Sequence, residues 1–191
     1  MSDTSTDIED LFKMAKEGTL PDDFKDWGVS TATGISVAHI AALYHRLPKD
    51  FKDWKLANES GHTVAHTAAV YGDLPKDFKD WDLTDNFGTT VAHNAAVHGH
   101  LLEGFSQWSL ANINGWTVAH TAAMRHSLPK DFNDWNLIDI DGMTVAHIAA
   151  RFGHLPKDFH MHHPNTWLLK NNKGETVKEL AIKFGYYIHY R

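Results

Sequence analysis

Several residue types and patterns are missing from this 191-residue sequence. It has no cysteine, which excludes disulfides, thiolate metal ligands and a cysteine nucleophile. No apolar stretch reaches the roughly 18 residues that a membrane-spanning helix needs. Acidic residues follow soon after Met1, so we expect no secretory signal peptide either. These absences predict a cytoplasmic protein, in the producing cell or in a host cell.

Catalytic and nucleotide-binding motifs are missing as well. The sequence contains no G-x-S-x-G, G-x-G-x-x-G, P-loop or H-E-x-x-H motif. Its 18 Lys and Arg residues against 24 Asp and Glu residues give a formal net charge of −6, a balance that disfavours contact with the phosphate backbone of nucleic acids. We therefore expect no enzyme activity, no cofactor, no direct nucleic-acid or membrane partner, and no small-molecule substrate.

What the sequence does contain is an internal repeat and 15 histidines. Copies of G-x-T/S-V-A-H-x-A-A, in most cases followed by L-P-K-D-F-x-D-W, begin at a glycine every 27 residues. These glycines are Gly34, Gly61, Gly88, Gly115 and Gly142. A period of this length indicates that each copy is one structural unit of a repeat protein.

Each copy is predicted to form two helices and a turn. In the copy that starts at Gly61, Thr63 is a favourable N-cap for a first helix over residues 64–70. A second helix is expected to start at the Leu-Pro step, with the proline at its first position, and to place Phe78 and Trp81 on one face. One copy cannot bury its Val, Ala, Phe and Trp side chains alone, whereas stacked copies can.

The segment G-x-T-V-A-H-x-A-A-x-x-G resembles the signature of the ankyrin repeat family, G-x-T-P-L-H-x-A-A-x-x-G-H, and recurs five times in register. The copies differ from the family because they have 27 residues rather than about 33, and because valine, as at Val64, stands where the family usually has proline. The copies look like the compact repeats of bacterial, phage and intracellular-pathogen proteins. The resemblance implies a helical stack that binds another protein through its turn tips and the exposed face of its first helices.

We therefore predict an all-α, ankyrin-like helical solenoid of stacked helix-turn-helix repeats, with connecting turns or short hairpins and two capping units. Charged residues enter the first-helix segment at both ends of the chain, as capping units require. The expected single repeat domain covers 1–191, with an N-terminal cap unit at 7–33, repeats at 34–60, 61–87, 88–114, 115–141 and 142–173, and a C-terminal cap unit at 174–191.

Five histidines occupy one position of the repeat: His39, His66, His93, His120 and His147. Equivalent positions in stacked units lie on the order of 10 Å apart, whereas the ligands of one zinc ion each lie about 2 Å from it. We therefore interpret these rings as structural, each hydrogen-bonded to the turn and to the neighbouring unit, as the resemblance implies.

A second group, His160, His162 and His163, lies in the insertion that lengthens the last repeat. Three neutral imidazoles in a short tract are a candidate site for zinc or nickel. The same tract also fits an irregular polar loop beside the C-terminal cap, and both interpretations stay open.

Positions that vary between copies are free to recognise a partner, whereas constant positions build the stack. At the turn tips and on the matching side of the first helices, several variable positions hold large apolar residues that we expect to be exposed, and exposed apolar groups mark interaction sites. The predicted partner-binding residues are Tyr71, Phe87, Thr89, His98, Ile113, Asn114, Trp116, Arg125, Ile140, Asp141, Met143 and Phe152.

The predicted function is that of a non-catalytic protein–protein interaction module. One alternative hypothesis is a bacterial or phage effector or counter-defence inhibitor that masks a host enzyme or a nucleic-acid-binding complex. Another is a metal-binding protein that uses the tract from His160 to His163. Acidic residues near the predicted surface, Glu59, Asp85 and Asp141, favour a partner with a basic rim.

Overall fold

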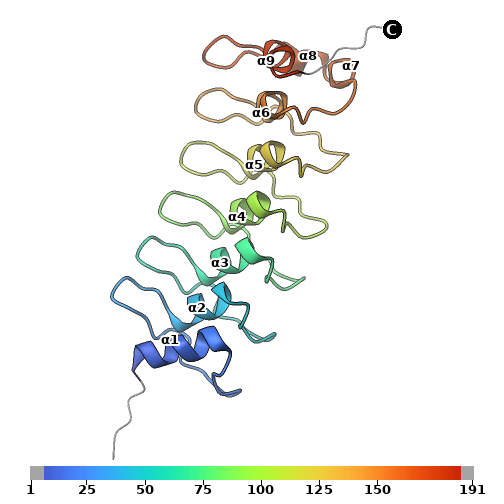
Figure 1. The fold of residues 1–191 in the computed structure, drawn as a ribbon. Coiled ribbons are helices and arrows are strands. Elements are labelled where there is room, and N and C mark those ends of the chain that lie inside the picture. The colour runs from blue at the N-terminus through green and yellow to red at the C-terminus, as the bar shows by residue number, and fades with distance from the viewer. Residues whose placement is uncertain (1–6, 186–191) are drawn as a thin grey trace, which may run out of the picture. The chain divides into compact units, whose positions relative to one another are not determined.

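The computed structural model describes residues 7–185, and within that range the chain forms helices, turns and isolated β-bridges. The helices are α1 (Ile8–Glu17), α2 (Val37–Leu43), α3 (Val64–Tyr71), α4 (Val91–His98), α5 (Val118–Arg125), α6 (Val145–Phe152), α7 (Phe159–His162), α8 (Pro164–Trp167) and α9 (Val177–Lys183). In each repeat a hairpin-like loop projects on one side of the helix and a turn segment on the other (Figure 1).

The chain divides into two compact units, the first ending at Leu102 and the second starting at Glu103. In the first unit α2 packs between α1 and α3, and α4 packs on α3. In the second unit α6 packs between α5 and α9. The boundary falls in the turn segment where Leu102 and Gly104 replace the proline and aspartate of most other copies. The prediction of an all-α fold of stacked repeats is confirmed.

The helices α2, α3, α4, α5 and α6 all begin with the same hydrogen-bonded cap. In α3 the Thr63 hydroxyl accepts a hydrogen bond from the His66 backbone N–H (3.3 Å) and donates one to Nδ1 of the His66 ring (2.8 Å). The same Nδ1 accepts a hydrogen bond from the Thr63 backbone N–H (3.1 Å). This is a capping box in which histidine takes the place of the usual glutamate or glutamine. Since Nδ1 accepts these bonds, the proton of the neutral ring lies on Nε2.

In four of these rings the Nε2 atom connects the helix to the next hairpin-like loop. His66 Nε2 donates to the Thr89 carbonyl at 3.0 Å. His39, His120 and His147 make the same kind of bond to a carbonyl of the following loop. The structural interpretation of these histidines is therefore confirmed, because both ring nitrogens are hydrogen-bonded within the stack.

The second helix predicted to start at the Leu-Pro step is absent from the copies that begin at Gly34, Gly61, Gly88 and Gly115, so that prediction is wrong for them. In the copy that begins at Gly142, the short helix α7 starts at Phe159. Residues 74–81 form turns, in which the Phe78 N–H donates to the Pro75 carbonyl and the Trp81 N–H donates to the Lys79 carbonyl, both at 2.9 Å. The turns instead point the aromatic rings towards the neighbouring repeats.

These rings form an edge-to-face ladder within each unit. In the first unit, the centroid of the Trp54 ring lies 4.9 Å from that of Phe51 in its own repeat and 5.9 Å from that of Phe78 in the next repeat. In the second unit, Trp135 lies 5.0 Å from Phe159 of the next repeat. Edge-to-face pairs stabilise by roughly 0.5–1.5 kcal/mol beyond their burial. The ladder therefore does the packing expected of the missing second helix.

Replacing Trp135, which is 4% exposed, tests the ladder. Trp135→Ala removes its edge-to-face contacts and leaves a cavity, so we expect the free energy of unfolding to fall by roughly 3–5 kcal/mol. Lys130→Ala, exposed in the same turn segment, should change it by less than about 0.5 kcal/mol. Urea titrations followed by circular dichroism measure both, and a wild-type midpoint for Trp135→Ala would contradict the role of the ladder.

The capping histidines also predict how stability depends on pH. Burial lowers the pKa of His39, His66, His120 and His147, and the bond from each ring to a carbonyl offsets only part of that shift. Histidines of the unfolded chain titrate near pH 6.5, about the ordinary value. As the pH falls below that value the unfolded state binds more protons than the folded state, so the free energy of unfolding decreases.

We expect urea midpoints to drop between about pH 7.5 and about pH 5.5. His66→Gln, which removes one of the titrating groups, should make that drop shallower. A midpoint that stays constant or rises over this range would show that the rings are not held neutral in the folded chain.

Candidate protein-binding surface

The predicted turn tips are hairpin-like loops that one aspartate or asparagine side chain holds in shape. In the loop before α6, Asp139 Oδ1 accepts hydrogen bonds from the backbone N–H groups of Asp141 and Met143, both at 2.9 Å. Neighbouring loops of the second unit are joined directly, because the Ile140 N–H donates to the Asn114 carbonyl at 3.0 Å. These bonds fix the positions of the residues at the tips.

Six of the eight partner-binding residues predicted in the second unit are exposed. They are Ile113, Asn114, Arg125, Ile140, Asp141 and Phe152. Ile113 and Ile140 have 67% and 65% of their surface exposed, and they occupy equivalent positions in the two joined loops. Together these two side chains form an apolar pair, which we call the tip ridge.

The expectation that Trp116 and Met143 are exposed is wrong. Both are half-buried and pack against the hydrophobic core of the second unit. Trp116 Nε1 donates to Thr121 Oγ1 at 2.8 Å, and its ring lies 5.2 Å from that of His120. Met143 Sδ accepts a hydrogen bond from Asn171 Nδ2 at 3.1 Å. The side chains turn inward because the position directly before the N-cap lies over the buried helix start.

Four of the predicted residues lie in the first unit: Tyr71, Phe87, Thr89 and His98. Phe87 is 63% exposed and stands at a tip whose loop is held by Asp85. Tyr71 and His98 are exposed on their helices, whereas Thr89 is half-buried.

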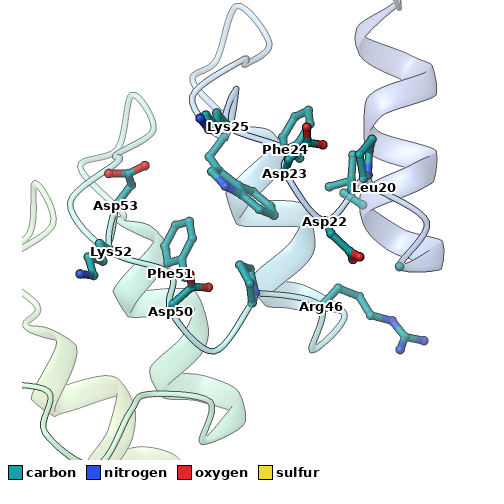
Figure 2. A pocket seen from close by; sticks show the side chains of 15 residues that line it. Leu20, Asp22, Asp23, Phe24, Lys25, Arg46, Asp50, Phe51, Lys52 and Asp53 are labelled. Atoms are coloured by element: carbon teal, nitrogen blue, oxygen red, sulfur yellow. The ribbon is translucent and has the colours of Figure 1, made fainter.

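The first unit also contains a groove of about 630 Å³ that the sequence did not predict. Figure 2 shows its two walls, with Asp22 and Phe24 on the turn segment of the N-terminal cap and Asp50 and Phe51 on the next turn segment. Four aspartates and three cationic side chains line the groove, so it carries a small excess of negative charge. The available sequence signal was Asp22, which stands where most other copies have lysine.

The structure does not gather His160, His162 and His163 into a metal site. His163 stacks on Phe159, with ring centroids 4.7 Å apart, whereas His160 faces Trp167 at 5.8 Å. Among residues 7–185 no group of three or more His, Asp or Glu side chains is placed to hold a metal ion. The tract forms the short helices α7 and α8 rather than an irregular loop.

No family model matches this chain, and no curated protein sequence matches it. Among solved structures it is similar to the ankyrin repeat domain of Bcl-3, described as a unique member of the IkappaB protein family. The TM-score is 0.63 and the identity 18%, with 90% of this chain and 92% of that chain covered. The chain therefore has the ankyrin repeat fold. Within the described residues, no helix combines the length and apolar character needed to cross a membrane.

The position of Trp116 predicts an effect on stability. Trp116→Ala should lower the free energy of unfolding by roughly 1–3 kcal/mol, because it removes core packing and leaves the Thr121 hydroxyl without this donor. Ile113→Ala, at an exposed tip, should change it by less than about 0.5 kcal/mol. Thermal melts compare the two, and equal melting temperatures would mean that Trp116 is not part of the core.

Proposed function

We propose that this chain is a non-catalytic protein-interaction module that binds its partner through the tip ridge and the neighbouring exposed helix positions of the second unit. The observation that carries the proposal is the tip ridge itself, where Ile113 and Ile140 are 67% and 65% exposed in hydrogen-bonded loops. Exposed apolar side chains on a repeat stack mark the surface that such proteins use for binding.

Two further observations support binding at this surface. The loops are held by internal hydrogen bonds, so a partner that docks on them does not have to order them, and the entropic cost of binding is lower. Phe152, 46% exposed at the end of α6, adds an aromatic side chain of the kind enriched in interfaces.

The histidines that cap helices and the aspartates that hold loops support a structural role over a catalytic one. Asp139 and Asp85 hold loops, and His66 and His120 cap helices. A catalytic site needs one asymmetric constellation of groups, whereas these groups are repeated along the chain and are engaged within it.

Charge in the tip ridge should abolish binding without unfolding the chain. The Ile113→Asp/Ile140→Asp variant places carboxylates in an apolar contact, and we expect at least about a tenfold loss of partner capture. Met161→Asp is the control, since Met161 is a 68% exposed residue of α7. This helix lies on the side of the second unit opposite the loops (Figure 1).

The measurement is quantitative mass spectrometry of proteins captured from the source cells by wild type and by both variants, with thermal melts as a check on folding. Proteins retained by wild type and Met161→Asp but lost from the ridge variant identify the partner. Capture of the same proteins at the same level by the ridge variant would refute this binding surface.

A further inference from the structure

A second groove, of about 280 Å³, lies in the second unit between the last regular repeat and the C-terminal cap. Met143 and Arg151 line it from the loop and helix of the repeat, Lys173 lines it from the loop before α9, and Lys183 and Phe184 line it from the end of α9. The groove therefore lies between the loops and the helices, on the side of the unit that carries the proposed binding surface.

The groove carries an excess of positive charge. Arg151, Lys173 and Lys183 line it together with two carboxylates, Asp141 and Glu175. Of these carboxylates, Glu175 already accepts a hydrogen bond from Asn171 Nδ2 at 3.1 Å. Among the ion pairs of the described residues, none involves the three cations.

The contrast with the rest of the chain makes this excess informative. The first unit has nine Lys and Arg residues against 16 Asp and Glu residues, whereas the second has nine against eight. Cations that form no ion pair with a described carboxylate are available to a negatively charged ligand, which gains attraction without first breaking such a pair.

Apolar surface adjoins the cations. Phe184, which lines the groove, is 45% exposed, and Lys183 Nζ lies 5.6 Å from the centroid of its ring. The tip ridge continues into the groove, because the lining residue Asn172 donates a hydrogen bond to the Ile140 carbonyl at 3.0 Å. A chain that lies on the ridge can therefore extend into the groove.

We propose that this groove holds an acidic peptide segment of the partner protein. Carboxylates of the segment pair with Arg151, Lys173 and Lys183, and a large apolar side chain beside them packs on Phe184. The inference rests on the proposed function, since it assigns the charge and the apolar anchor of a segment that continues from the tip ridge. It reverses the basic rim expected from the sequence, as far as the second unit is concerned.

The test is selection of a random peptide library, displayed on phage, against the immobilised full-length chain. We expect the enriched peptides to be net acidic with at least one large apolar residue, and to bind the Arg151→Glu/Lys183→Glu variant at least about tenfold more weakly. The control Lys130→Glu/Lys157→Glu makes the same change of charge at exposed turn positions of the same unit, and should bind the peptides as wild type does. Thermal melts check folding, and Arg151→Gln/Lys183→Gln replaces the reversal variant if that variant melts early.

Enrichment of neutral or basic peptides would overturn the proposal. So would acidic peptides whose binding falls equally in the Arg151→Glu/Lys183→Glu variant and in the control variant. Displacement of the peptides by an equal concentration of inorganic phosphate would also overturn it, because the groove would then be a general anion site. The Ile113→Asp/Ile140→Asp variant tests the proposed function separately, since neither ridge residue lines the groove. If that variant still binds its partner while acidic peptides still require Arg151, the proposed binding surface at the tip ridge is refuted and the proposed peptide groove is supported.

Discussion

Within each unit, the hydrogen bonds of buried histidines connect a helix to its own cap and to the loop of the next repeat. Nδ1 of His66 accepts from the Thr63 backbone, and Nε2 donates to the Thr89 carbonyl. A single neutral tautomer makes both bonds, whereas a protonated Nδ1 would meet a donor instead of an acceptor. At the C-terminal cap Glu179 takes this position and caps its helix without bridging, and no further repeat follows it among the described residues.

The aromatic ladder explains how a copy of only 27 residues can stack. In place of a second helix, the turn segments of the copies that begin at Gly34, Gly61, Gly88 and Gly115 each supply a Phe and a Trp whose rings meet edge to face. Within each unit such contacts also join neighbouring repeats. Because single aromatic side chains make these contacts, the turn segment does not need the additional residues of a second helix. The shortening relative to the family pattern of about 33 residues falls on this segment.

The proposed binding surface of the second unit is formed by side chains that do not pack between repeats. Its tips expose Ile113 and Ile140, while the cap and the last repeat together place three cations around a groove. In the first unit, Asp85, which in sequence favoured a basic partner, holds its own loop through Oδ1. Charge read from the sequence alone therefore overstated the acidity available to a partner, because part of it is engaged in local hydrogen bonds.

The sequence by itself determined the first helices and the structural role of the histidines. Thr63 as N-cap and Gly72 as the left-handed C-cap, with φ of 75°, act over one helix, so local residue pattern was sufficient. Only the tertiary structure decided that residues 74–81 form turns, that Trp116 packs inward, and that Arg151 and Lys183 share a groove. Each of these outcomes depends on contacts with residues from a neighbouring repeat or a neighbouring element. Local sequence preferences do not predict such contacts and can be overridden by them.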